Sequence, residues 1–222
     1  MSNRLFGKWR RWLHRIYNEQ LLYLLINQHI FRQLAECTTP YVGTNRAAYL
    51  AQWMKQGYVA FAGTAVRRML DDPAEARKRA NIVSLVVLLR DVEQHAPLFT
   101  RKRFRKRYTD KRLPIDIADQ DFYSITRNKR ATCLSASRVR RDIKALGTVG
   151  GPVRRLVNKV IAHTERDRRK VGKVKFTQLD DAIQALAETF RRYWLLIQGT
   201  SLTRLAPFDE YDVLSDLKKI WP

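Results

Sequence analysis

The sequence predicts an all-α protein, built as an antiparallel helical bundle. Apolar residues recur at spacings of three and four along most of the chain, as they do on one face of a helix. No stretch sustains the alternation of apolar and polar residues that is typical of a half-buried strand. With 222 residues, 45% of them hydrophobic and 10% aromatic, the chain can bury one good core, so we expect a single domain over residues 1–222.

Residues 1–36 are expected to form a basic amphipathic helix that packs on the bundle. Its apolar residues share one helical face, and they are Leu5, Trp9, Trp12, Leu13 and Ile16. Five cations precede its first acidic residue, Glu19, and they are Arg4, Lys8, Arg10, Arg11 and Arg15. A peripheral membrane anchor and an organelle presequence are the competing interpretations. Packing is favoured because the apolar pattern continues through Phe31 without a cleavage-like break.

Two more helices are expected after a loop over residues 38–45. Asn45 is a good N-cap, so a second helix should begin there and run to Met69. Asp72 followed by Pro73 is typical of an N-cap and a first helical position, which predicts a third helix that runs toward His95.

Residues 98–133 are expected to be a basic insertion or loop region. Their densest cluster interleaves cations with two aromatic rings, and it contains Arg101, Lys102, Arg103, Phe104, Arg105, Lys106, Arg107 and Tyr108, with Lys111 and Arg112 just beyond. This composition suits RNA, most simply a single strand, because cations contact phosphates while rings stack on bases. A solvated mobile loop and a surface for an acidic protein remain open as alternatives.

The C-terminal helices are expected within residues 135–222. A helix capped by Ser135 or Ser137 should end at Gly147, and Gly150-Gly151-Pro152 should separate it from the next helix. The clearest helix starts with a capping box at Thr177 and Asp180 and stops at Gly199. A final short helix is expected over residues 209–221.

The candidate site lies on the helix that begins at Pro152 and reads PVRRLVNKVIAHTERDRRK. One side is apolar and should pack against the protein. Arg155, Lys159 and His163 follow one another at spacings of four on an adjacent ridge, and Asn158 lies to one side. More cations follow beyond the ridge, at Arg166, Arg168 and Arg169. Such a group of side chains favours the binding of phosphate. A lone histidine after an apolar run is, however, more often a packing or capping residue.

Three stretches carry a resemblance to a known family. The segment VNKVIAH at residues 157–163 resembles the signature of the HEPN superfamily, in which an arginine and a polar residue precede a histidine. Residues 67–73 (RRMLDDP) with 81–85 (NIVSL) are similar to an element of the abortive-infection, AbiU-like branch. Residues 176–199 and the closing Ile220-Trp221 are similar to that branch as well.

The resemblance implies a HEPN-like bundle and a metal-independent endoribonuclease that acts as a toxin or phage-defence effector. His163 would transfer protons, Asn158 would orient the bound RNA, and Arg155 with Lys159 would stabilise the phosphate charge. The products would carry 2′,3′-cyclic phosphate ends, and no cofactor or metal would be needed. Family members pair two such helices, which implies a homodimer through residues 152–166. A nucleotidyltransferase-type antitoxin or another defence protein is the partner that the resemblance suggests.

One position departs from the family pattern. Val157 stands where the signature has its arginine, six residues before His163. Arg155, Lys159 or an arginine from another element, such as Arg68, could supply the charge. Alternatively the site has lost its activity, and the protein binds RNA or a partner without cutting.

Charge and composition limit the partners and the location. There are 43 Lys and Arg residues against 21 Asp and Glu, which gives a net charge of +22 and an isoelectric point near 10.6. A polyanionic partner is therefore expected, whether nucleic acid, an acidic protein or an anionic membrane. Cys37 and Cys133 are the only cysteines and have no neighbouring ligand residues, so neither a disulfide scaffold nor a zinc site is expected. The longest apolar run, Leu21 to Ile26, is too short to span a membrane, and we expect a cytoplasmic protein.

Overall fold

The computed structural model describes residues 2–38, 45–72, 82–161, 174–206, 208 and 212–220. Within these residues the protein is all-α, as predicted, and the only β-type pairing among them is an isolated bridge between Thr100 and Cys133. No helix in the described part of the chain is both long enough and apolar enough to cross a bilayer.

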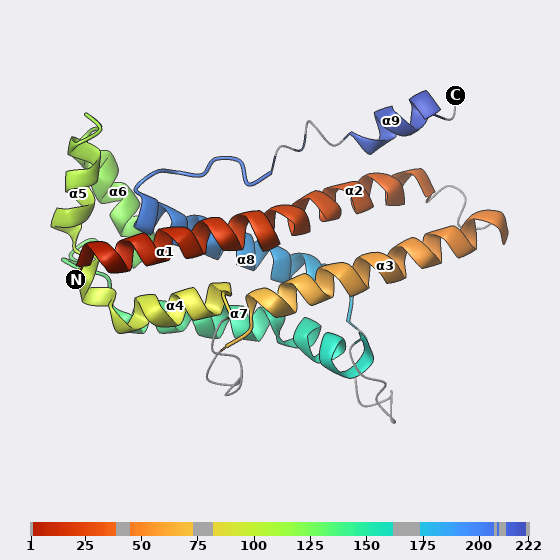
Figure 1. Cartoon of the computed structure of the whole chain (residues 1–222), viewed down its shortest axis with the longest axis horizontal. Helices are drawn as coiled ribbons and strands as arrows, with labels where there is room; N and C mark the ends of the chain where they lie inside the picture. Colours follow the sequence, from red (N-terminus) through yellow and green to blue (C-terminus); the bar gives the residue numbers. More distant parts are fainter. Residues whose placement is uncertain are drawn as a thin grey trace.

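Helices α1 and α2 run antiparallel to α3, and α7 runs antiparallel to α8 (Figure 1). Helix α1 continues into α2 through a short π-helical segment, η1, and α3 returns beside them. Helix α7 packs on α3, α4 and α8, and it passes from α-helix into a second π-helical segment, η4. The elements up to α4 are α1 Ser2–Ile16, η1 Tyr17–Leu21, α2 Leu22–Thr38, α3 Asn45–Met69 and α4 Leu85–Gln94. The later ones are α5 Arg101–Thr109, α6 Ile115–Thr126, α7 Ala136–Leu156, η4 Val157–Ile161, α8 Phe176–Gln198 and α9 Val213–Ile220.

The N-terminal helix is a packed part of the bundle. Trp9, Leu13 and Ile16 are fully buried, and α1 contacts both α4 and α8. The Trp9 indole donates a hydrogen bond to Asp91 Oδ2 at 2.5 Å. Because the apolar face of α1 is covered by the protein, it is not free to enter a membrane in this conformation.

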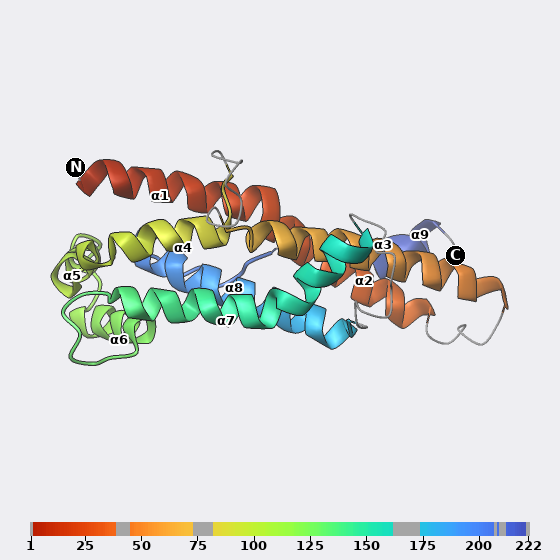
Figure 2. The same cartoon turned by 90° about the horizontal axis from the view of Figure 1, so that it is seen from below.

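Helix α7 is longer than the sequence indicated. It does not end at Gly147 but continues through Gly150, Gly151 and Pro152 to Leu156. Gly150 serves close packing and is not a helix stop, because a Cβ there would overlap the Leu70 side chain at the end of α3. Pro152 lacks the N–H that would bond one turn back, and Figure 2 shows the last turns of α7 bending toward α3.

The predicted third helix also needs correction. Residues 82–84 are not helical, so no continuous helix joins Asp72 to His95, and the proposed start at Pro73 lies outside the described residues. Helix α4 is capped by Ser84, whose Oγ accepts from Val87 N at 3.0 Å and donates to the Asp71 carbonyl at 2.6 Å.

The predicted capping box of α8 at Thr177 and Asp180 does not form. Lys175 N instead donates to Gln178 Oε1 at 2.9 Å, and because a lysine ammonium cannot accept a hydrogen bond, this is only half of a capping box. The stop was predicted correctly, because Gly199 has a left-handed φ of 67° immediately after the helix.

Candidate nucleic-acid interface

The last turns of α7 bring three of the predicted site residues together. Arg155 is exposed, and Asn158 and Lys159 are half-buried in η4, one turn further along. π-Helical turns inside α-helices are frequent at functional sites. His163, Arg166, Arg168 and Arg169 lie outside the described residues, so the histidine end of the ridge remains a prediction.

Val157 lies in the core, at the position where the resembling signature has arginine. It is 1% exposed and faces Gly63 of α3. A Cβ at Gly63 would lie 3.0 Å from Val157 Cγ2, so the two helices approach too closely here for a larger pair of residues. A guanidinium at this position would point into apolar surroundings in this conformation, and an active site would need its cation from elsewhere.

Of the alternative arginines, Arg155 is the better placed. It lies on α7 itself, one turn before Asn158 and Lys159. Arg68 is exposed but lines a different cavity, which α3 forms with η1 and the start of α2, together with Glu19, Tyr23 and Phe61.

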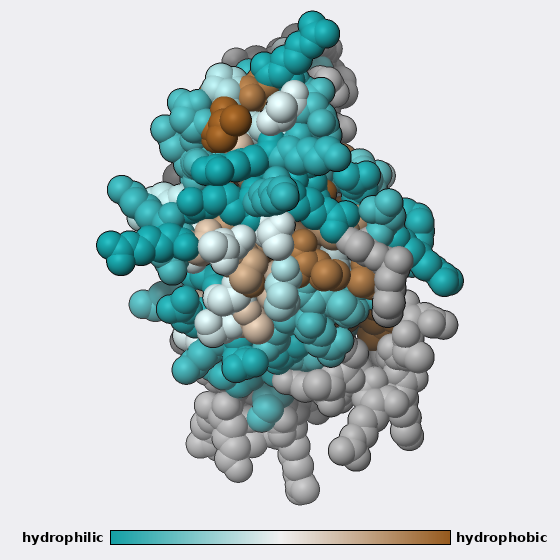
Figure 3. Space-filling view, turned by 90° about the vertical axis from the view of Figure 1, so that its left-hand side faces the viewer, coloured by the Kyte–Doolittle hydropathy of each residue, from teal (hydrophilic) through white to brown (hydrophobic). Residues whose placement is uncertain are grey.

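The basic cluster at residues 101–112 is helical and not a loop. It forms α5 and the turn after it, and α5 pairs with α6 at one end of the bundle. Figure 3 views this end, where hydrophilic side chains surround smaller apolar patches. Phe104 and Tyr108 are only 3% and 4% exposed, because their spacing of four places both rings on the packed face of α5. The expectation that they stack on bases is therefore wrong, because neither ring is accessible.

Several cations of this cluster have structural partners. Arg105 makes a two-pronged contact with Asp119, at 2.7 and 2.5 Å, and this hydrogen bonding lowers the pKa of Asp119. Arg101 donates to the Lys129 carbonyl, and Arg103 lies over the Phe6 ring at 4.0 Å and donates to Asn3 Oδ1.

Arg107 and Lys111 cap the C-terminus of α8. Arg107 donates to the carbonyls of Leu196 and Ile197 at 2.7 and 3.1 Å, and Lys111 donates to that of Gly199 at 3.1 Å. Burial, together with nearby arginines, lowers the pKa of Arg107 to about 10. Cations at this position complement the helix dipole. Lys102 and Lys106 are exposed on the same helix.

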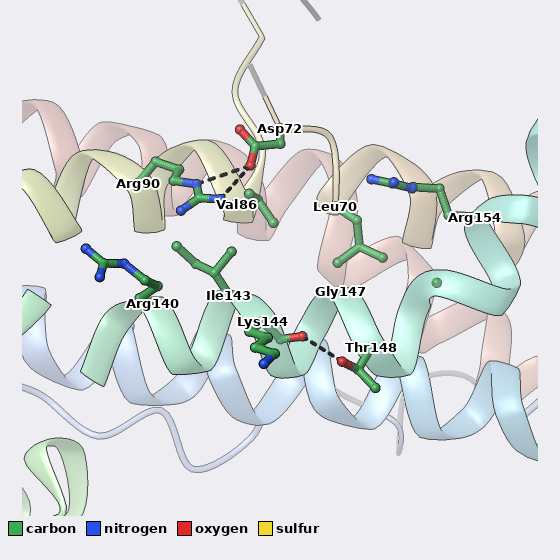
Figure 4. Close-up of a pocket in the computed structure, with 11 residues that line it drawn as sticks. Leu70, Asp72, Val86, Arg90, Arg140, Ile143, Lys144, Gly147, Thr148 and Arg154 are labelled. Carbon is green, nitrogen blue, oxygen red and sulfur yellow. Dashed lines mark hydrogen bonds and ion pairs between the residues drawn. The ribbon is translucent and has the colours of Figure 1, made fainter. Parts of the chain in front are cut away.

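A groove between α4 and α7 collects cations that sequence reasoning missed. It has an open volume of about 440 Å³, and its lining includes Arg90, Arg140, Lys144 and Arg154 (Figure 4). Asp72 accepts from Arg90 at 3.0 and 3.1 Å, and Glu93 accepts from Arg90 at 3.1 Å and from Arg140 at 2.8 Å. Lys144 has no carboxylate partner in the described part of the chain. The net charge of the groove is positive, which suits an anionic ligand.

The signal that could have revealed the groove is a spacing. Arg140, Lys144, Gly147, Gly151 and Arg154 follow one another at four, three, four and three residues. That series marks one helical face, but it is visible only if α7 is read as one continuous helix.

The comparisons with known proteins give one match. The family model HEPN_AbiU2, described as AbiU2, matches residues 6–218, which is nearly the whole chain. No curated protein and no solved structure matches the chain.

Proposed function

Because the chain belongs to the HEPN AbiU2 family, we propose that it is a metal-independent endoribonuclease that acts as a toxin or phage-defence effector. The observation that carries the proposal is the end of α7. There Arg155, Asn158 and Lys159 are grouped on a helix that is anchored by the buried Val153 and Val157. Two cations and an amide held by a packed helix suit a bound phosphodiester.

The chemistry assigns one role to each residue. His163 takes the proton from the ribose 2′-hydroxyl, whose oxygen then bonds to phosphorus. The bond from phosphorus to the 5′-oxygen breaks, and the leaving oxygen takes a proton from an imidazolium. Arg155 and Lys159 stabilise the extra negative charge on the phosphorane, and Asn158 orients the phosphate. The products are a 2′,3′-cyclic phosphate and a free 5′-hydroxyl.

A dimer would complete the site. One copy of the helix offers one imidazole, whereas the reaction needs a base and an acid. A two-fold contact through residues 152–166 would place two such helices around one phosphate, with one histidine in each role. A nucleotidyltransferase-type antitoxin that covers this surface is the protein partner we propose for the silenced state.

The test is cleavage of single-stranded RNA in EDTA, with the product ends analysed. Wild-type protein should yield 2′,3′-cyclic phosphates, and His163→Ala should lose at least a hundredfold in rate. His14→Ala is the matched control, because His14 is exposed on α1 and contacts Trp194 and Gln198 of α8. Equal cutting by His163→Ala and wild type would refute the assignment.

A second function is favoured by the buried Val157. If Arg155 does not replace the arginine of the signature, the protein would bind RNA without cutting it. Salt-sensitive RNA binding with no cyclic phosphate after long incubation would support this function. Loss of cleavage in Arg155→Ala, with binding retained, would argue against it.

A further inference from the structure

One wall of the α4–α7 groove is a face of α7. Arg140, Lys144, Gly147, Gly151 and Arg154 all line the cavity, and their spacing places them in one row along the helix. The next position in the same series is Asn158, a proposed site residue. The row of cations therefore leads along α7 toward the candidate site.

The opposite wall of the groove is built to hold a cation in place. Asp72 and Glu93 fix the Arg90 guanidinium from two sides, and the side chains of both acids are only 12% exposed. Leu70, Val86 and Ile143 line the cavity between the two walls (Figure 4). The groove thus combines an apolar lining with cationic rims, which suits a ligand with both apolar faces and phosphates.

The middle of the groove is open because α7 has no side chain there. A Cβ at Gly147 would meet nothing within 4 Å, and one at Gly151 would meet only Arg155, at 3.9 Å. A ligand backbone can therefore approach the helix closely between Lys144 and Arg154.

We propose that this groove holds the sugar-phosphate backbone of the RNA strand whose scissile phosphate is bound at the end of α7. The inference rests on the proposed function and deepens it by naming the substrate contacts. Lys144, Arg140 and Arg154 contact successive phosphates, while the apolar lining accepts ribose or base faces. A strand is favoured over a free nucleotide because the row of contacts continues along the helix beyond the cavity.

The experiment measures binding separately from cleavage. All proteins carry His163→Ala, and binding of a fluorescent 12-nucleotide single-stranded RNA is followed by anisotropy in EDTA. Gly147→Glu places bulk and negative charge in the groove and should weaken binding at least tenfold. Gly57→Glu is the matched control, because Gly57 is exposed on α3 and its Cβ would also meet nothing within 4 Å. It should change affinity less than twofold, and both variants should melt within a few degrees of the parent.

A second measurement tests for phosphate contact directly. Lys144→Ala should reduce the slope of log affinity against log salt by about 0.7, the value for one phosphate contact on a single strand. Equal losses of RNA affinity in Gly147→Glu and Gly57→Glu would overturn the proposal, and so would 5′-AMP binding as tightly as the 12-mer.

The two proposals can fail separately. If protein with His163 intact never cuts RNA but Gly147→Glu still weakens binding, the groove assignment stands and the nuclease assignment falls. If cleavage depends on His163 while Gly147→Glu binds RNA like the parent, the groove assignment falls and the nuclease assignment stands.

Discussion

The molecule has two basic regions that differ in what their cations do. In the α5 cluster the cations are consecutive in sequence, yet several of them hold the protein together. Arg107 bonds to carbonyls of α8, and Arg105 bonds to Asp119. In the α4–α7 groove three cations are spaced along one face of α7, Arg90 comes from α4, and all four line a cavity.

The comparison teaches that the density of charge along a chain is a poor guide to binding. A guanidinium that satisfies helix carbonyls is not available to a phosphate without a loss of stability. A lysine on an open groove has water as its main partner and exchanges it readily for phosphate. We therefore expect substitutions in the cluster to affect stability and substitutions in the groove to affect affinity.

The largest effect is expected from Arg107→Ala. It removes the partner of two α8 carbonyls in a half-buried position, which should lower the free energy of unfolding by about 2–3 kcal/mol. For a chain of this length that corresponds to a fall in Tm of roughly 4–12 °C. Thermal melting measures it, with the exposed Lys106→Ala as control. A large loss of RNA affinity without a loss of stability would mean that Arg107 binds RNA and does not stabilise the fold.

The next effect separates the two faces of α7. Gly150→Ala forces a methyl group into Leu70 and should cost about 1–3 kcal/mol of stability. Gly147→Ala fills open space and should instead stabilise the helix by about 0.5–1 kcal/mol. Urea denaturation of both variants gives the two free energies. If both substitutions were stabilising, Gly150 would not mark the close approach of α7 to α3.

Removing two positive charges from each region should change RNA affinity by a smaller free energy than the most destabilising substitution above changes stability. Arg140→Ala with Lys144→Ala should weaken binding about tenfold, or roughly 1.4 kcal/mol. Stability should change little, because Arg140 is 67% exposed and Glu93 keeps Arg90 as its partner when Arg140 is removed. Lys102→Ala with Lys106→Ala is the matched pair on α5 and should weaken binding less than threefold. Equal losses would mean that α5 also contacts RNA.

Local signals account for the parts of the fold that were predictable. The position of the α3 start, at Asn45, agrees with the expectation, and the stop of α8 at Gly199 follows from capping chemistry that is visible in a few consecutive residues. The helical content follows from periodicity. The end of α7 did not follow, because Gly150 resembles a stop signal until its contact with Leu70 is known.

The candidate site was predictable only in part for the same reason. Arg155, Asn158 and Lys159 are close in sequence, so helical spacing was enough to group them. Arg90 and Lys144 line the same groove from two different helices, and no local pattern places them together. Phe104 and Tyr108 share one face of α5, but only the position of the helix decides whether that face is buried.

The smallest effect tests whether Arg105 is a structural residue. Its hydrogen bond lowers the pKa of Asp119 in the folded protein, so the bond stabilises the fold above the ordinary aspartate pKa of about 3.9. That contribution is lost as the pH falls through the lowered pKa. The difference in Tm between wild type and Arg105→Ala should therefore be constant from pH 5 to pH 7 and shrink below about pH 4.

The matching groove variant should behave differently over the same range. Lys144 has no carboxylate partner in the described residues, so the Tm difference for Lys144→Ala should not depend on pH between 3 and 7. If the Arg105→Ala difference persisted at pH 2, the contact with Asp119 would not be its cause. If the Lys144→Ala difference instead shrank in acid, Lys144 would have a carboxylate partner in solution, and its availability to a phosphate would be lower than the groove geometry indicates.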